Sequence, residues 1–90
     1  MGKELKEDTC PRIEAFILIT TRPGMLWNVV EDAKKIQGVK LAIPVAGRFD
    51  VLIQIDTNNV SWVIARIHDL KGILRTETLV SLEVRFGDGV

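Results

Sequence analysis

The chain has 90 residues, of which 47% are hydrophobic and 27% are charged, a balance typical of one small globular domain. Its 12 basic and 12 acidic side chains cancel, so no net field attracts the protein to nucleic acid or to an anionic membrane, and direct DNA binding is disfavoured. A chain this short hides only about 60–65% of its unfolded surface when it folds alone, so association with further copies would stabilise it.

Residues 1–12 are charged and follow no hydrophobic period, which predicts a flexible N-terminal arm. The arm contains the only cysteine, Cys10, so no internal disulfide can form, and a bridge between two chains is left open. The longest apolar run, from Ala15 to Ile19, is far too short to span a bilayer, and the chain start has no signal-peptide core. We therefore expect a cytoplasmic protein.

A first strand is predicted from Ile13 to Thr21, with apolar side chains on both faces. One face carries Ala15, Ile17 and Ile19, and the other carries Phe16 and Leu18. The segment Thr21-Arg22-Pro23-Gly24 then indicates a helix entrance, with a hydroxyl near the cap and proline in the first turn. The helix has one apolar stripe, which consists of Leu26, Val29, Val30, Ala33 and Ile36.

The end of this helix is predicted from Lys34 and Lys35, which favour the negative end of the helix dipole, and from Gly38, which terminates it. Trp27 lies off the apolar stripe. Its indole either packs over the helix start or contacts a partner subunit.

Two apolar runs, residues 39–45 and 51–55, are joined by the link 46–50, which predicts a hairpin. In both runs the odd-numbered residues are β-branched or leucine, so we expect them to face a core and the even-numbered residues to face away. Pro44 is tolerated in a sheet only at an edge, so the first of these two strands should be an edge strand.

Asp56-Thr57-Asn58-Asn59 is a run of cap-forming residues that predicts the start of a second helix. Gly72 ends this helix as Gly38 ended the first. The apolar stripe consists of Val60, Val63, Ile64, Ile67 and Leu70. A last strand is predicted for residues 74–85 and a frayed tail for residues 86–90.

The predicted order is strand, helix, strand, strand, helix, strand, or two β-α-β units in tandem. Right-handed crossovers interleave these units into a four-stranded antiparallel sheet with two helices on one face. The sequence therefore predicts an α+β ferredoxin-like domain over residues 13–85.

The other face of that sheet should be apolar without a helix to cover it. It is expected to carry Phe16, Leu18, Ala42, Leu52 and Leu79, diluted by Gln54, Ser81 and Glu83. Covering even a few hundred Å² of it is worth several kcal/mol at about 25 cal/mol per Å². We therefore predict a face-to-face dimer through these residues.

The sequence offers no chemistry for catalysis or for metal binding. One histidine and one cysteine cannot supply the three or four ligands that a metal needs, and His68 and Asp69 point about 100 degrees apart on a helix. No nucleotide-binding or nucleophile motif occurs. We expect no cofactor and disfavour an enzyme.

Three motifs, taken together in their order along the chain, indicate a family. They are the proline-glycine turn within residues 15–24, the loop Ala46-Gly47-Arg48-Phe49-Asp50, and Arg75-Thr76-Glu77-Thr78 in the last strand. With this order and spacing, residues 13–85 resemble the RAM domain, the effector-binding module of the Lrp/AsnC transcription regulators. The resemblance implies a dimer through the sheets, dimers closing into octameric or similar rings, and amino-acid effectors bound between dimers. Family members carry a helix-turn-helix domain ahead of this module, and only a short arm stands here. The resemblance therefore implies a stand-alone version, which would sense amino acids for another partner or join the ring of a full-length regulator.

An amino acid needs N–H donors for its carboxylate and an acceptor for its ammonium. The backbone amides of Gly47 and Arg48 are candidate donors and Asp50 is the candidate acceptor, beside Phe49. The last strand adds Thr76, Glu77 and Thr78 if it lies against a neighbouring hairpin. In the alternative interpretation, Gly47 only turns the chain and Asp50 only caps the loop.

Two other functions remain open. The same sandwich dimer, as an α+β barrel, hosts small monooxygenases and isomerases, but their cavity between sheet and helices is polar, whereas this interface is predicted to be almost wholly apolar. The other is a structural oligomer without a ligand.

Overall fold

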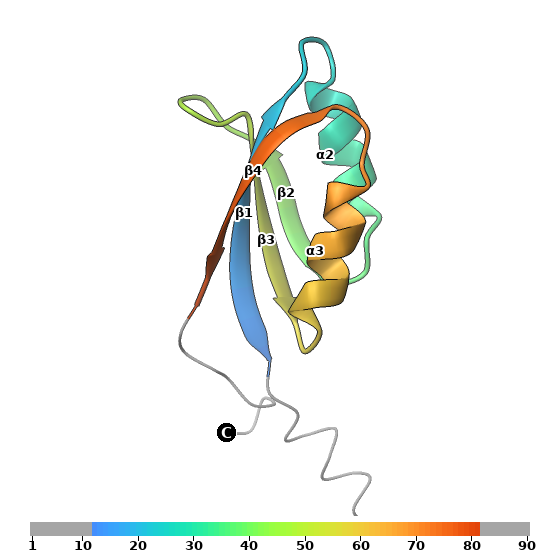
Figure 1. The fold of residues 1–90 in the computed structure, drawn as a ribbon, viewed down its shortest axis with the longest axis vertical. Coiled ribbons are helices and arrows are strands. Elements are labelled where there is room, and N and C mark those ends of the chain that lie inside the picture. The colour runs from blue at the N-terminus through green and yellow to red at the C-terminus, as the bar shows by residue number, and fades with distance from the viewer. Residues whose placement is uncertain (1–11, 82–90) are drawn as a thin grey trace, which may run out of the picture.

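The computed structural model describes residues 12–81, which form four strands and two helices. In chain order these are β1 (Ile13–Thr21), α2 (Leu26–Lys34), β2 (Val39–Pro44), β3 (Val51–Thr57), α3 (Val60–His68) and β4 (Ile73–Val80). The strands are antiparallel and lie in the order β2-β3-β1-β4, and both helices lie on the same side of the sheet (Figure 1). The predicted ferredoxin-like fold is confirmed, and β2 with its Pro44 is an edge strand as predicted. The predictions for residues 1–11, with Cys10, and for residues 82–90, with Glu83, fall outside the described residues.

The core lies between the sheet and the helices and is aliphatic. Alternate residues of β1 and β3 belong to this core. Ala15, Ile17 and Ile19 of β1 pair with Ile55, Ile53 and Val51 of β3, and all six are completely buried. The helices contribute the predicted stripes, with Val29, Val30, Ala33, Val63 and Ile67 buried. Within residues 12–81 no polar or charged residue is fully buried.

A bulge in β2 corrects the predicted facing of that strand. Val39 pairs with Ile55, but Leu41 pairs with Gln54, so two steps along β2 match one step along β3 and Lys40 is the additional residue. Every later residue of β2 is therefore turned over. Ala42 pairs with Ile53 and is 2% exposed in the core, so its predicted place on the uncovered face is wrong.

The same bulge moves two large side chains out of the core. Leu41 and Ile43 pair with Gln54 and Leu52 on the uncovered face, and are 40% and 36% exposed. The odd-numbered residues of β2 were predicted to face the helices, and beyond Val39 they do not. The uncovered face is thereby more apolar than predicted, because it loses an alanine and gains a leucine and an isoleucine.

The start of α2 also differs from the prediction. Thr21 is the last residue of β1, and the chain then turns through Pro23 and Gly24, with the Met25 N–H donating to the Arg22 carbonyl at 3.0 Å. Gly24 has φ 80°, as the third residue of a type II turn requires. Met25 is the N-cap and makes no side-chain capping bond. Trp27 is 61% exposed and thus lies off the core, as its place off the stripe predicted.

The start of α3 follows the prediction, because Asn59 is its N-cap and the Asn59 side chain accepts from the Trp62 N–H at 3.2 Å. The helices do not end at the predicted glycines. Their C-cap residues are Lys35 and Asp69, which both have the right-handed helical backbone conformation. Gly38 instead stands just before β2 with φ 101°. A Cβ there would lie 2.7 Å from Val63 Cγ2, so the glycine lets α3 approach the start of β2.

Candidate functional site

The hairpin link, which comprises residues 45–50 in the structure, is anchored to the end of β1. The Asp50 N–H donates to the Ile19 carbonyl and the Val45 N–H donates to the Asp50 carbonyl, both at 2.8 Å. Asp50 Oδ2 accepts from the Thr21 N–H at 2.9 Å and from the Thr21 hydroxyl at 3.3 Å. Figure 1 shows the link, in yellow-green, projecting away from the sheet on the side opposite the helices. Asp50 therefore fixes where the loop leaves the sheet.

This anchored loop forms a cavity of about 250 Å³ with the first half of β4. The loop contributes Arg48 and Phe49, and β4 contributes Arg75, Thr76 and Glu77. The Arg48 guanidinium lies over the Phe49 ring, 5.9 Å from its centroid. The Thr76 hydroxyl lies 3.2 Å from His68 Nε2, which ties this wall to the end of α3. We call this space the loop cavity.

The ionic groups of the loop cavity are not neutralised by one another. Within residues 12–81 the ion pairs are Arg12 with Asp56, Lys34 with Glu31 and Lys35 with Asp32. Arg48, Arg75 and Glu77 are in none of them, and all three residues are exposed. The cavity thus offers two guanidiniums, one carboxylate and an aromatic ring, whereas the Thr76 hydroxyl is directed to His68 on the helix side of β4.

Four of the predicted effector-binding residues, Arg48, Phe49, Thr76 and Glu77, line the loop cavity. Gly47 is exposed with φ 132° and does not line it, and Thr78 lies further along β4, opposite the buried Ile17. Asp50 is bonded to Thr21 and does not line it either, which matches the alternative prediction of a loop cap. Effector binding by any of them stays a prediction.

Arg75 is the cavity residue that the sequence interpretation missed. The Arg-Thr-x-Thr motif contains it, but a prediction based on hydroxyl groups selects only the threonines. The strand period of two is the sequence signal that would have identified Arg75. Arg75 and Glu77 are two residues apart in a strand, so their side chains share a face. Its neighbour across the ladder is Thr20, whose buried hydroxyl has no hydrogen-bond partner within residues 12–81.

The uncovered face of the sheet carries an apolar patch. Its members are Phe16, Leu18, Leu41, Ile43, Leu52 and Leu79, which we call the open-face patch. Phe16 pairs with both Gln54 and Leu79, and Leu18 pairs with both Leu52 and Glu77, so the patch crosses all four strands. Leu79 is 51% exposed. Four of the predicted interface residues therefore lie together, and Ala42 does not join them.

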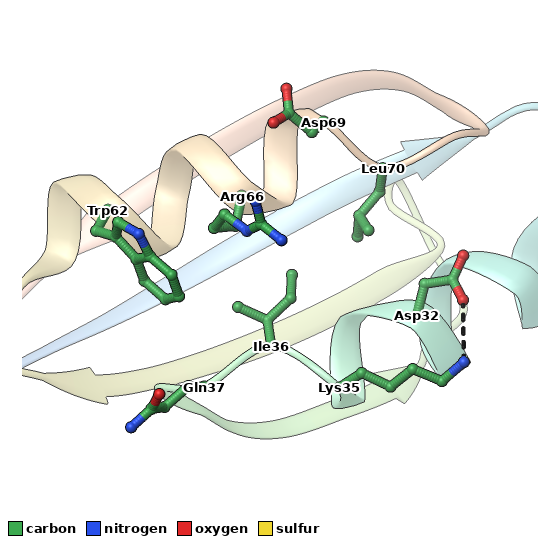
Figure 2. A pocket seen from close by; sticks show the side chains of 8 residues that line it. All are labelled: Asp32, Lys35, Ile36, Gln37, Trp62, Arg66, Asp69 and Leu70. Carbon is green, nitrogen blue, oxygen red and sulfur yellow. Dashed lines mark ion pairs between the residues drawn. The ribbon is translucent and has the colours of Figure 1, made fainter.

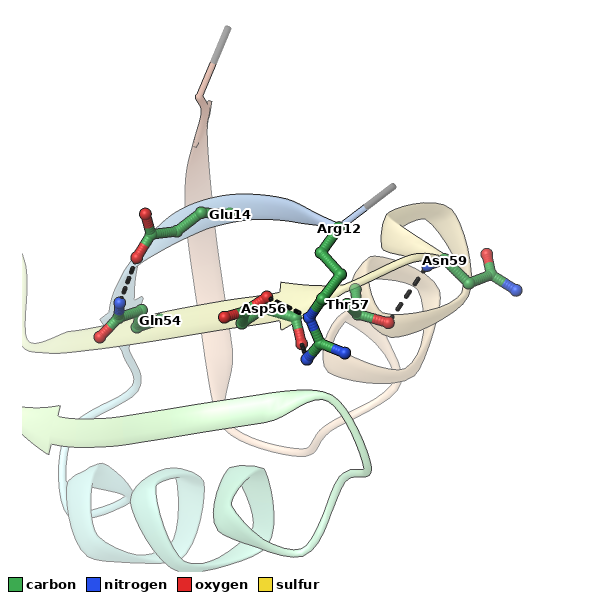
Figure 3. A network of polar contacts seen from close by, with 6 residues as sticks. All are labelled: Arg12, Glu14, Gln54, Asp56, Thr57 and Asn59. Atoms are coloured by element: carbon green, nitrogen blue, oxygen red, sulfur yellow. Dashed lines mark hydrogen bonds and ion pairs between the residues drawn. The ribbon is translucent and has the colours of Figure 1, made fainter. Parts of the chain in front are cut away.

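Polar contacts bound the patch at the end of the sheet where β1 begins (Figure 3). Arg12 Nε donates to Asp56 Oδ1 at 3.1 Å, and Gln54 Nε2 donates to the Glu14 carboxylate. Because these groups are already bonded within the chain, a partner could cover this end without leaving them unpaired.

A second, larger cavity of about 460 Å³ lies between the helices and the turns that follow them (Figure 2). Lys35 pairs with Asp32 at 3.8 Å, and the Arg66 guanidinium lies 5.7 Å from the centroid of the Trp62 ring. The remaining lining residues are Ile36, Gln37, Asp69 and Leu70. No predicted site residue lies in this cavity.

Two negative observations concern the described residues. Among residues 12–81 no three histidine, cysteine, aspartate or glutamate side chains are close enough together to hold a metal ion. Neither helix in that range is long and apolar enough to cross a membrane.

Comparison with known proteins finds similarity in structure. No protein-family model and no curated protein sequence matches the chain. The protein TTHA0845 from Thermus thermophilus is 28% identical with a TM-score of 0.72, over 79% of this chain and 94% of that one. FFRP-DM1 is 26% identical with a TM-score of 0.70, over 78% of this chain and 99% of that one.

A larger protein shares the fold at lower identity. An AsnC family transcriptional regulator from Agrobacterium tumefaciens is 16% identical with a TM-score of 0.69, over 88% of this chain and 54% of that one. The chain thus corresponds to about half of the regulator and to nearly all of the two smaller proteins. These neighbours fit the resemblance noted in the sequence: the chain shares its fold with small FFRP-like proteins and with part of an AsnC family regulator, as a RAM-like domain would.

Proposed function

We propose that this domain is a regulatory module that binds an amino acid or a related small effector in the loop cavity. The observation that carries the proposal is the composition of that cavity. Its guanidiniums can bind a carboxylate through paired N–H donors, and Glu77 can accept from an ammonium group. These are the two groups that every free amino acid presents.

The module would act through assembly, beginning with a dimer formed by two open-face patches. The patch crosses all four strands, and the polar groups at one end of it are already hydrogen-bonded within the chain, so a partner could cover them without leaving them unpaired. The loops project on the same side of the sheet as the patch, so in such a dimer each loop would lie beside the partner's sheet, and further dimers would assemble into an octamer-like ring. Regulation would follow if the ring included, or acted on, a full-length Lrp/AsnC regulator.

Thermal-shift screening against the twenty amino acids, together with light scattering for the particle mass, tests the proposal. Stabilisation by one amino acid and a mass of at least two chains are expected. An assembly that no amino acid stabilises would instead favour the structural oligomer. A particle of one chain would remove the proposed function.

The role of Asp50 is tested by Asp50→Ala, with affinity and stability measured on the same variant. If its carboxylate accepts from the effector's ammonium, calorimetry should show a loss of about 1.5–3 kcal/mol in binding, the usual value for a hydrogen bond to a charged group. Unchanged affinity with lowered stability would leave Asp50 only its observed task of anchoring the loop to Thr21.

The enzymatic alternative receives no support from the space between the sheet and the helices. In an α+β-barrel enzyme that space holds the reacting groups. Here, within residues 12–81, it is filled by buried aliphatic side chains, without one buried polar or charged residue.

A further inference from the structure

We infer that the effector of the loop cavity is an acidic amino acid, a molecule with two carboxylates and one ammonium. This inference rests on the proposed function and makes it more specific. It starts from the charges of the cavity wall, where Arg48 and Arg75 stand against Glu77 alone.

The count of charges selects the ligand class. The cavity lining carries a net charge of about +1, since two guanidiniums face one carboxylate. An amino acid with a neutral side chain would occupy Glu77 and one arginine and leave the other guanidinium without a partner. A second carboxylate on the ligand would pair with that arginine. A basic amino acid would bring a second positive charge, and the cavity lining has no second carboxylate to pair with it.

The placement of these groups fits a molecule of that size. Arg75 and Glu77 are two residues apart on one strand, so their Cα atoms are separated by roughly 6.6 Å at about 3.3 Å per residue. Their side chains share a face, yet no ion pair joins them in the structure. A small ligand carrying both kinds of charge could lie between them. The cavity, at about 250 Å³, is smaller than the sites of about 300–1,000 Å³ that hold drug-sized molecules.

The second arginine is held in place by the loop. The Arg48 guanidinium rests over the Phe49 ring, and Phe49 is half-buried beside the anchor that Asp50 makes with Thr21. An ordered guanidinium loses less freedom when it binds a carboxylate, and its planar N–H groups match the two carboxylate oxygens. Arg48 and Arg75 therefore reach the cavity from the loop and from β4, one for each carboxylate of the ligand.

Isothermal titration calorimetry with matched ligand pairs tests this. L-Glutamate and L-aspartate are compared with L-glutamine and L-asparagine, which have nearly the same shape without the second charge. We expect one acidic amino acid to bind at least about tenfold more tightly than its amide, the effect of one hydrogen-bonded charge pair. Equal affinity for an acid and its amide would overturn the inference.

The variants Arg75→Gln and Arg48→Gln assign the charges, with Arg22→Gln as a control in the exposed turn before α2. Each cavity variant should reduce the preference for the acid over the amide by about tenfold or more, and Arg22→Gln should leave it unchanged. Using both variants keeps the test valid if one of them folds poorly. A preference that survives both changes would contradict the assignment.

Three further outcomes separate this inference from the proposed function. If a neutral or basic amino acid binds most tightly, the function stands and the acidic class is wrong. If no amino acid binds, both fail. If glutarate, which lacks the ammonium, binds as tightly as glutamate and Glu77→Gln has no effect, the cavity recognises anions and the acidic amino acid is overturned as its ligand.

Discussion

The two faces of the sheet are built from alternate residues of the same strands, yet they end in opposite environments. Ile53 is completely buried under the helices, and Leu52 beside it lies in the open-face patch with part of its side chain in water. Both faces carry branched aliphatic side chains. The difference is that α2 and α3 cover only one of them (Figure 1).

A single copy therefore buries the apolar residues on one face of its sheet and leaves those on the other face partly exposed. The covered face is complete, with a core in which Gly38 and Gly72 allow close approach between the two halves of the chain. The open face has a polar border but no cover within residues 12–81. If two copies cover each other's open faces, the free energy of unfolding of the whole domain should rise with protein concentration.

Truncation of one residue on each face sharpens this contrast most strongly. Ile53→Ala should lower the free energy of unfolding by about 2–5 kcal/mol, because it removes buried methyl groups and leaves a cavity. Urea denaturation should show this loss at every protein concentration. Leu52→Ala is the matched control, and its cost should grow as the concentration rises into the range where dimers form. A concentration-independent cost at Leu52 would contradict its place in an interface.

A side chain at Gly38 should destabilise the packing of α3 against the start of β2. Gly38→Ala places a Cβ 2.7 Å from Val63 Cγ2 at a backbone φ of 101°, so we expect a loss of about 3 kcal/mol from strain and overpacking together. Gly24→Ala is the control, because Gly24 also has positive φ but nothing within 4 Å of the added Cβ. It should cost only about 1–2 kcal/mol in thermal or chemical unfolding. Equal losses would mean that the contact with Val63 can relax.

A charge on the open face should break its pairing with a second copy. Leu18→Lys puts an ammonium at the centre of the open-face patch, opposite Glu77, so the single chain keeps a favourable cross-strand pair. We expect dimerisation to weaken by about 30-fold or more, roughly 2 kcal/mol, in analytical ultracentrifugation. Unchanged circular dichroism would show that the fold is intact. An unweakened dimer would place the interface elsewhere.

The smallest effect concerns α3, one of the two helices that cover the core. Asn59→Ala removes the side chain that caps α3 at the Trp62 N–H and should cost about 1 kcal/mol in unfolding free energy. Ser61→Ala, on an exposed position of the same helix, should be neutral or slightly stabilising because alanine favours helices. If the two variants behave alike, the cap contributes nothing measurable.

Much of the candidate site was predictable, and the reason is local chemistry. Residues 47–50 separate two apolar runs, which predicts a loop, and the alternation around Thr76 and Glu77 predicts a strand. Arg75 was not recognised, because its importance depends on Arg48, a residue 27 positions away in the sequence. The hydrogen bond from Thr21 to Asp50 was missed for the same reason, and Thr21 was predicted to cap a helix instead.

The sequence by itself determined the order of the elements, the two helical stripes and the inward faces of β1 and β3, since periods and turn residues act over a few neighbouring positions. The tertiary structure alone decided the bulge at Lys40, which turns Ala42 inward and brings Leu41 and Ile43 onto the open-face patch. Register is fixed by pairing between strands, and one additional residue reverses every side chain after it. The cavity between the loop and β4 depends on the same long-range placement.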